Sequence, residues 1–183
     1  MQIETGTPTS TDPAGRAWAK EPLTAVVKFI LETHHVVTRK AIDALPPLAA
    51  RVRARHGELH PETRSVEGLV RRLVEDLGPH MLKEERILFP YIEALEAPGR
   101  GADACFPTVQ NPIRVMLREH EAVEEILGEL RAVTANYALP TDACESYHAL
   151  YAGLEELEAD LKRHIRIEND VLFPGAIALE AAG

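Results

Sequence analysis

The stretch His80-Met81-Leu82-Lys83-Glu84-Glu85-Arg86-Ile87-Leu88-Phe89-Pro90 recurs later in the chain as His164-Ile165-Arg166-Ile167-Glu168-Asn169-Asp170-Val171-Leu172-Phe173-Pro174. Both copies read His-x-x-x-Glu-x-x-x-Leu-Phe-Pro, and Ala94-Leu95-Glu96 and Ala178-Leu179-Glu180 continue the match at the same offset of 84 residues. An offset shared over this length indicates an internal duplication. Because residues i and i+4 lie on one face of a helix, each copy directs an imidazole and a carboxylate to one point, which is half of a metal site.

Four stretches around this repeat have apolar residues at helical intervals, and no strand pattern interrupts them. They run from Pro22 to Leu45, from about Ser65 to Tyr91, from Ile113 to Leu130 and from Thr141 to Leu172. The sequence therefore predicts an all-α, up-down-up-down four-helix bundle with an internal pseudo-twofold repeat. Residues 21–183 are expected to form this bundle, after a flexible polar leader over residues 1–20.

Prolines suggest where the helices are interrupted. Pro46-Pro47 is expected to bend or break the first helix, and each Leu-Phe-Pro is expected to end its helix while packing into the core. Residues 97–112, rich in proline and glycine, read as the crossover between the two halves.

Composition excludes several classes of protein. The net charge is -9 and basic residues are interleaved with acidic ones, which argues against a nucleic-acid partner. No secretory signal and no run of about 18 apolar residues is present, so we expect a cytoplasmic protein without a membrane span. Cys105 and Cys144 form no C-x-x-C pair, and neither a disulfide framework nor a thiolate metal site is expected.

The repeat also extends to the first helix of each half, because His120 follows His35 by 85 residues. The two hairpins together supply enough side chains for two metal ions: His35, His80, Glu84, His120, His164 and Glu168. Carboxylates on an apolar stripe are costly to bury unless cations compensate them. If both glutamates bridge, each metal has two imidazoles and two carboxylate oxygens. An oxo or hydroxo bridge from solvent would then leave one open position per octahedral ion. Ligand type alone does not choose between iron, zinc, copper and nickel.

Some polar positions are open to more than one interpretation. His34 adjoins His35, and the repeat offset favours His35 as the ligand. Glu124 stands four residues after His120 on the expected core side of its helix, so it is a further candidate ligand, an outer carboxylate or part of a solvated face. The remaining histidines read as loop or surface residues: His56, His60 and His148.

These motifs, together with Glu119-His120-Glu121, resemble the hemerythrin-like cation-binding proteins, and more closely the di-iron iron-sulfur cluster repair family. The resemblance covers about residues 22–180. It implies a non-haem di-iron centre on the six residues that the repeat selects, with both glutamates bridging. The repair proteins usually carry a further N-terminal domain with adjacent cysteines, and the short leader here has no cysteine.

Two functions follow from the resemblance. One is a nitrosative or oxidative stress protein whose di-iron centre acts on nitric oxide or peroxide, or donates iron to damaged clusters of iron-sulfur proteins. The alternative is a module that reversibly binds or stores oxygen or nitric oxide without catalysis. A purely structural metal is a third interpretation, which the histidine-rich and coordinatively open ligand set disfavours.

Overall fold

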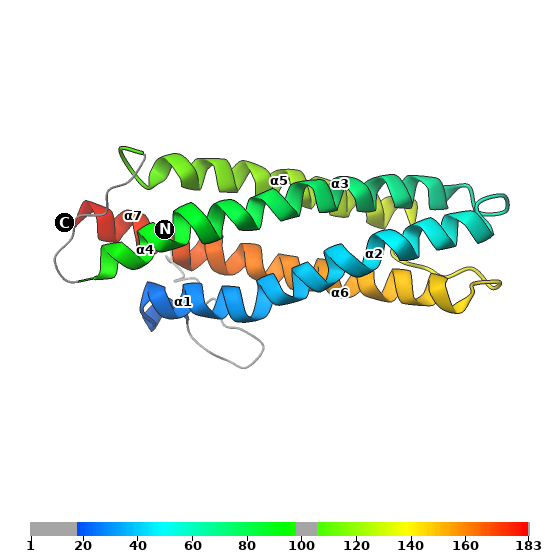
Figure 1. Ribbon diagram of the computed structural model, residues 1–183, viewed down its shortest axis with the longest axis horizontal. Helices are drawn as coiled ribbons and strands as arrows, with labels where there is room; N and C mark the ends of the chain where they lie inside the picture. The colour runs from blue at the N-terminus through cyan, green and yellow to red at the C-terminus, as the bar shows by residue number, and fades with distance from the viewer. Residues whose placement is uncertain (1–17, 98–105, 183) are drawn as a thin grey trace, which may run out of the picture.

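The computed structural model describes residues 18–97 and 106–182. Over these residues all regular secondary structure is helical, and four long helical columns lie side by side with successive columns running in opposite directions (Figure 1). This confirms the predicted all-α bundle. The elements in chain order are η1 (Trp18–Lys20), α1 (Leu23–Phe29), η2 (Ile30–His34), α2 (His35–His56), α3 (Glu62–Lys83), η3 (Glu84–Leu88), α4 (Phe89–Glu96), α5 (Gln110–Val133), α6 (Glu145–Ile167), η4 (Glu168–Leu172) and α7 (Phe173–Ala181).

The first column contains α1, η2 and α2, and the predicted break at Pro46-Pro47 does not occur in it. Helix α2 continues through both prolines to His56. Pro46 is half-buried and Pro47 exposed. The carbonyls that lose a helical partner belong to Ile42, which is half-buried, and Asp43, which is exposed. Side-chain packing on both sides of the prolines then outweighs the local cost.

The prediction that Leu-Phe-Pro ends each helix is also wrong, because η3 and η4 are π-helical turns that lead into α4 and α7. The amide of Phe89 donates to the carbonyl of Glu84, and the amide of Phe173 to that of Glu168, each five residues back. The proline that follows occupies the first turn of the next helix, where a missing N–H costs little. The packing half of the prediction holds, since both phenylalanines are buried.

The repeated glutamates at the ends of the motif, Glu96 and Glu180, cap the first helix of each half. Glu96 accepts hydrogen bonds from the amides of Leu23 (2.7 Å) and Thr24 (2.9 Å) at the start of α1. Glu180 accepts one from the amide of Val109 (2.8 Å), immediately before α5. A carboxylate at a helix N-terminus satisfies orphan amides and opposes the helix dipole. The sequence match beyond the prolines therefore has a structural reason.

Two apolar clusters fill the bundle, one toward each end. The cluster nearer the α2–α3 connection includes Leu45, Leu73, Leu130 and Leu154. The other includes Ile30, Leu88, Ile113 and Phe173. Along each column the predicted ligands lie between members of these two clusters. They form a polar layer that separates two apolar cores: His35, His80, Glu84, His120, His164 and Glu168. Helix α2 packs on α3 and α6, and α3 packs on α5.

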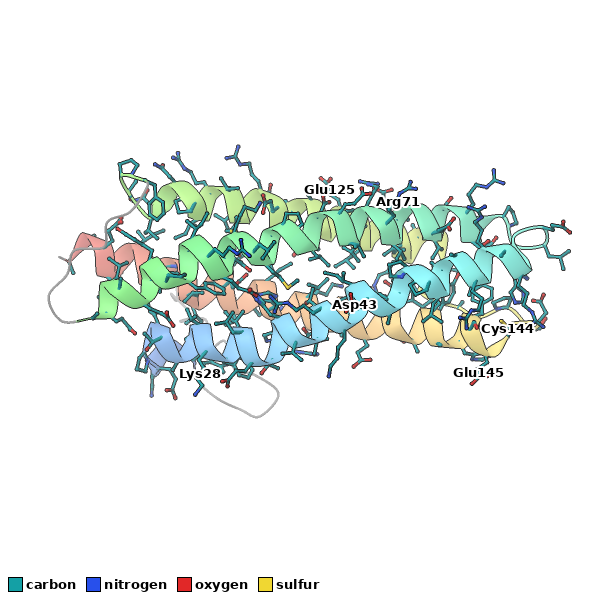
Figure 2. All side chains as sticks on the ribbon, viewed as in Figure 1. Lys28, Asp43, Arg71, Glu125, Cys144 and Glu145 are labelled. Atoms are coloured by element: carbon teal, nitrogen blue, oxygen red, sulfur yellow. The ribbon has the colours of Figure 1, made fainter. Side chains whose placement is uncertain are left out.

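The chain before α1 also contributes to the core. Trp18 in η1 is fully buried, with its ring centroid 4.4 Å from that of Phe29. Trp18, from the expected leader, thus packs on the bundle, and residues 1–17 lie outside the described part. Charged side chains such as Lys28, Asp43, Arg71 and Glu125 cover the outside of the columns (Figure 2). None of the described helices is both long and apolar enough to cross a membrane.

Candidate metal centre

Glu84 is the first residue of η3, and its carboxylate is completely buried in the polar layer. Its two oxygens face different imidazoles: Oε1 lies 3.2 Å from Nε2 of His80, and Oε2 lies 3.2 Å from Nε2 of His35. His80 is on the same column, one turn earlier, whereas His35 comes from the start of α2. The carboxylate therefore stands between two imidazoles.

Glu168, the first residue of η4, repeats this arrangement in the second half. Its carboxylate is also completely buried. Oε1 lies 3.1 Å from Nε2 of His164, and Oε2 lies 3.1 Å from Nε2 of His120. Both glutamates thus present one oxygen to each of two imidazoles, which is the disposition that a bridging carboxylate needs.

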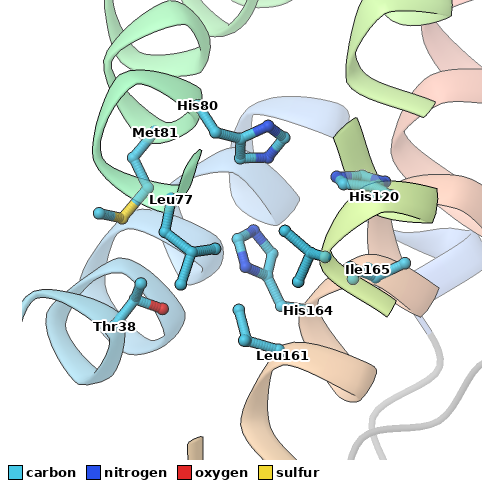
Figure 3. A pocket seen from close by; sticks show the side chains of 9 residues that line it. Thr38, Leu77, His80, Met81, His120, Leu161, His164 and Ile165 are labelled. Atoms are coloured by element: carbon cyan, nitrogen blue, oxygen red, sulfur yellow. The ribbon is translucent and has the colours of Figure 1, made fainter. Parts of the chain in front are cut away.

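The donor atoms of these side chains fall into two groups that share Glu84. One group contains His80, Glu84, His120 and Glu168, and the other His35, Glu84 and His164, with the donor atoms in each group within 4.8 Å of one another. Each group takes its imidazoles from both halves of the chain, whereas the repeat suggested one set of ligands from each hairpin. Figure 3 shows the rings of His80, His120 and His164 turned toward a common space.

Hydrogen bonding within the protein does not satisfy these donor atoms. Among the described residues, the buried side-chain atoms of the layer without a hydrogen-bond partner are Nε2 of His35, His120 and His164 and both carboxylate oxygens of Glu84 and Glu168. Burying polar or charged groups in this state costs on the order of several kcal/mol. Imidazole nitrogens and carboxylate oxygens together are the donors of first-row divalent metals. The two buried clusters are therefore able to hold metal ions.

The electrostatics of the layer also favour cations. Burial alone would lower the pKa of His80, but the negative charge of Glu84 outweighs burial and raises this pKa to about 9. Burial would raise the pKa of Glu168, yet the imidazoles of His164 and His120 hold it well below its ordinary value. Without a metal, the layer thus draws protons onto imidazole to balance its carboxylates, and a metal ion replaces those protons.

A sequence model of the hemerythrin HHE cation-binding domain matches residues 28–176, which include both halves of this layer. The chain belongs to the hemerythrin HHE family. It is similar to proteins named iron-sulfur cluster repair protein YtfE, with 37% identity to that of Yersinia pestis (strain Pestoides F) over 160 residues, covering 87% of this chain and 68% of the relative. The YtfE protein of Yersinia pseudotuberculosis serotype O:1b (strain IP 31758) is 36% identical over the same coverage.

Three imidazoles of this HHE domain have polar partners on their far side. Nδ1 of His35 lies 2.6 Å from Glu85, Nδ1 of His80 lies 2.9 Å from Glu119, and Nδ1 of His120 lies 3.0 Å from the side-chain oxygen of Asn169. Such partners fix the ring orientation and leave Nε2 for the metal. The sequence pattern did not predict these partners. The available signal was their position beside predicted ligands.

His34 is buried next to His35 but lies outside both groups. Its Nδ1 is 3.0 Å from each carboxylate oxygen of Asp160, and its ring stacks on that of His164 with centroids 5.2 Å apart. The π turn η2 ends between the two histidines, and the amide of His35 donates to the carbonyl of Ile30. This wider turn allows both adjacent side chains to point inward, which a regular helix period does not predict.

Of the alternatives for Glu124, the structure supports the solvated face, and the expectation that it lies on the core side of its helix is wrong. Glu124 is exposed on α5, whereas its neighbour Val123 is buried, and Glu124 belongs to none of the metal-capable groups found among the described residues. His56 is a second correction: it was expected on a loop or the surface, but it is the last residue of α2 and is buried. His60 is half-buried, and His148 is exposed as expected. Cys105 lies outside the described residues, and Cys144 is a free, half-buried thiol.

A small cavity of about 10 Å³ opens beside the layer (Figure 3). Three histidines of the layer and mainly apolar residues line it: Thr38, Leu77, His80, Met81, His120, Val123, Leu161, His164 and Ile165. The hydroxyl of Thr38 is buried and has no hydrogen-bond partner in the described part of the chain. A cavity of this size has room for about one water-sized molecule. The cluster of His80 and His120 therefore borders a space for a small ligand.

Proposed function

We propose that this HHE domain holds a non-haem di-iron centre and acts as an iron-sulfur cluster repair type protein under nitrosative or oxidative stress. The six proposed ligands are His35, His80, Glu84, His120, His164 and Glu168. The observation that carries the proposal is that both oxygens of each buried glutamate face imidazoles of two different groups. Two ions that shared these two carboxylates would account for this arrangement of donor atoms.

Iron is proposed over other first-row metals on the basis of the relatives. Histidine and carboxylate donors suit several metals, so the ligand set does not distinguish them. The curated relatives are named iron-sulfur cluster repair proteins, which supports iron as the ion handled here. When bound, a pair of irons supplies redox chemistry toward nitric oxide or peroxide, or iron for a damaged cluster of an iron-sulfur protein.

The protein around the centre controls what reaches it. The two apolar cores on either side of the layer exclude bulk water. The cavity beside His80 and His120 is too small for most metabolites and suits a diatomic molecule or peroxide. Within it, the unpartnered hydroxyl of Thr38 can donate a hydrogen bond to a bound ligand.

A second candidate function is reversible binding or storage of oxygen or nitric oxide without turnover. The apolar lining of the cavity favours it, because an uncharged diatomic molecule enters such a space without losing strong hydration. The two functions differ in what happens after the ligand binds, which an experiment can separate.

The test is optical spectroscopy of the iron-loaded protein, before and after reduction and exposure to oxygen, nitric oxide or peroxide. Consumption of nitric oxide or peroxide over repeated cycles with a reductant supports the stress function. Full recovery of the starting spectrum on removing the gas supports storage. Thr38→Val should change the spectrum of the ligand-bound form without changing the iron content. A spectrum that responds to none of these reagents would contradict both functions.

A further inference from the structure

A separate group of metal-capable side chains lies where two connections meet at one end of the bundle. His56 ends α2, His60 lies in the α2–α3 connection, and Asp142 lies in the α5–α6 connection. Both connections are at the same end of the molecule (Figure 1). His56 is 21 residues after His35 on α2, which is about 30 Å along a helix, so this group is remote from the buried layer.

His60 is oriented as metal-binding histidines usually are. Its Nδ1 lies 3.2 Å from the carboxylate of Glu62, and its Nε2 lies 2.9 Å from Oδ1 of Asp142. A carboxylate on one ring nitrogen fixes the ring and leaves the other nitrogen to face the ligand position. In His60 the nitrogen that faces the ligand position is Nε2, and the carboxylate of Asp142 lies beside it.

His56 is the residue that a simple ion pair does not explain. It is only 7% exposed, and its buried Nε2 has no hydrogen-bond partner among the described residues. Its Nδ1 is 3.8 Å from Oδ2 of Asp142, beyond a normal hydrogen bond. The ring packs against Tyr147, with centroids 5.3 Å apart, and its centroid lies 6.0 Å from that of His60. Buried imidazoles normally have hydrogen-bond partners, and His56 has none among the described residues although Nδ1 faces the carboxylate of Asp142.

We propose that His56, His60 and Asp142 bind one further first-row divalent cation such as Zn²⁺ or Fe²⁺. One donor atom from each residue lies within 4.8 Å of the others. Bonds of about 2.0–2.2 Å would bring such atoms to about 3–4 Å from one another, which small side-chain movements achieve. Two imidazoles and one carboxylate leave positions for water.

The surroundings of this site give it a different character from the buried centre. Asp142 is 47% exposed and His60 19% exposed at their side chains, so an ion here can exchange with solution. The carboxylates of Asp142 and Glu62 give the group a negative charge when both imidazoles are neutral. A bound ion would also fasten the α2–α3 connection to the α5–α6 connection, since its donors come from both.

The experiment is a calorimetric titration of zinc into the protein whose buried centre is already filled, with iron content measured in the same samples. One zinc ion per chain should bind without release of iron. His60→Gln or Asp142→Asn should remove this binding, and Glu62→Gln should weaken it by about 10- to 100-fold. His148→Gln is the matched control, because His148 is exposed on α6 outside the group, and it should bind zinc like the wild type.

Cobalt provides a second measurement, because its visible absorption depends on the number and geometry of the ligands around the ion. The wild type should gain a cobalt spectrum that Asp142→Asn lacks, while helicity by circular dichroism stays the same in both. The proposal is overturned if no further ion binds, if zinc binds only as iron leaves, or if the double variant His60→Gln/Asp142→Asn binds zinc as well as the wild type. In those cases the His60–Asp142 contact is only a hydrogen bond between two connections.

Discussion

Glu85 and Asn169 occupy equivalent places in the two halves of the bundle but differ in charge. Each follows a buried glutamate by one residue and accepts a hydrogen bond from Nδ1 of a histidine, at 2.6 Å for Glu85 with His35 and at 3.0 Å for Asn169 with His120. A carboxylate partner withdraws the Nδ1 proton more strongly than an amide and makes the imidazole a better metal donor. The duplicated halves therefore do not support their histidines equally.

Glu85→Gln should loosen one of the two proposed ions. Loss of a charged hydrogen-bond partner of a metal ligand typically lowers metal affinity by about 10- to 100-fold. Here the affected group is that of His35 and His164. Asn169→Asp should not weaken metal binding, because it adds the missing carboxylate. Competition with a chelator, followed by metal analysis over time, measures both. Equal loss of both ions from Glu85→Gln, or weaker binding in Asn169→Asp, would contradict the proposed inequality.

Replacement of the buried glutamates should be far more damaging than replacement of the exposed one. Glu84→Gln and Glu168→Gln each remove a charge that faces both groups, so each should lower the affinity for both ions. Glu124→Gln should retain wild-type metal content, because Glu124 is exposed and belongs to neither group. Metal content after dialysis is the measurement. If Glu124→Gln lost as much metal as the other two variants, the assignment of the bridging residues would be wrong.

Removal of metal should change how stability depends on pH. In the metal-free protein the pKa of His80 is raised to about 9 against an ordinary value of 6.5. This protonation therefore stabilises the fold fully below about pH 6.5, and the contribution is lost as pH rises to about 9. The melting temperature of chelator-treated protein should fall across this window, whereas the metal-loaded protein, whose imidazoles are held neutral, should change little. Parallel melting curves for the two forms would contradict a metal site in the core.

Glu158 should stabilise the α5–α6 hairpin independently of any metal. Its buried carboxylate accepts hydrogen bonds from Arg131 (2.6 Å) and Tyr137 (2.7 Å) and pairs with Lys162. Burial would raise its pKa, but Arg131 and Lys162 outweigh burial and lower the pKa below the ordinary 4.5. The stabilisation is present above pH 4.5 and is lost as pH falls through the lowered pKa.

Glu158→Gln should accordingly cost about 1–3 kcal/mol at neutral pH, and its stability should fall less steeply than that of the wild type as pH drops below 4.5. Urea denaturation at several pH values measures this. Glu156→Gln, at an exposed position two residues away, should match the wild type. Equal losses in the two variants would show that the buried contacts contribute nothing specific.

The bundle and the six buried donors could be predicted because each rests on a period that the sequence shows directly. The helical spacing of apolar residues predicted the four helical columns. The duplicated motif pointed to Glu84 and Glu168, and both are buried, as expected for side chains on the apolar face of a helix. Glu124 was placed on the core side because helical spacing does not define the edge of the apolar face to within one residue. The preceding residue, Val123, is buried, whereas Glu124 is exposed.

The π turns, by contrast, have no signature in hydrophobic spacing. Pro90 and Pro174 suggested helix ends because proline normally removes a needed hydrogen bond, but a preceding π turn makes that bond unnecessary. The position of His56 depends on Tyr147, which is distant in sequence and covers the imidazole only in the folded chain. In the sequence, Gly57 next to His56 indicates a loop, and His56 was therefore expected at the surface.

The most direct test of the di-iron centre is iron X-ray absorption on protein reconstituted anaerobically with ferrous iron and freed of excess metal. Two irons per chain are expected, in a shell of nitrogen and oxygen donors, with iron–iron scattering at about 3.5–4 Å if the ions share Glu84 and Glu168 as proposed. A single iron per chain, or two irons without iron–iron scattering, would contradict the shared carboxylates on which the proposed centre depends.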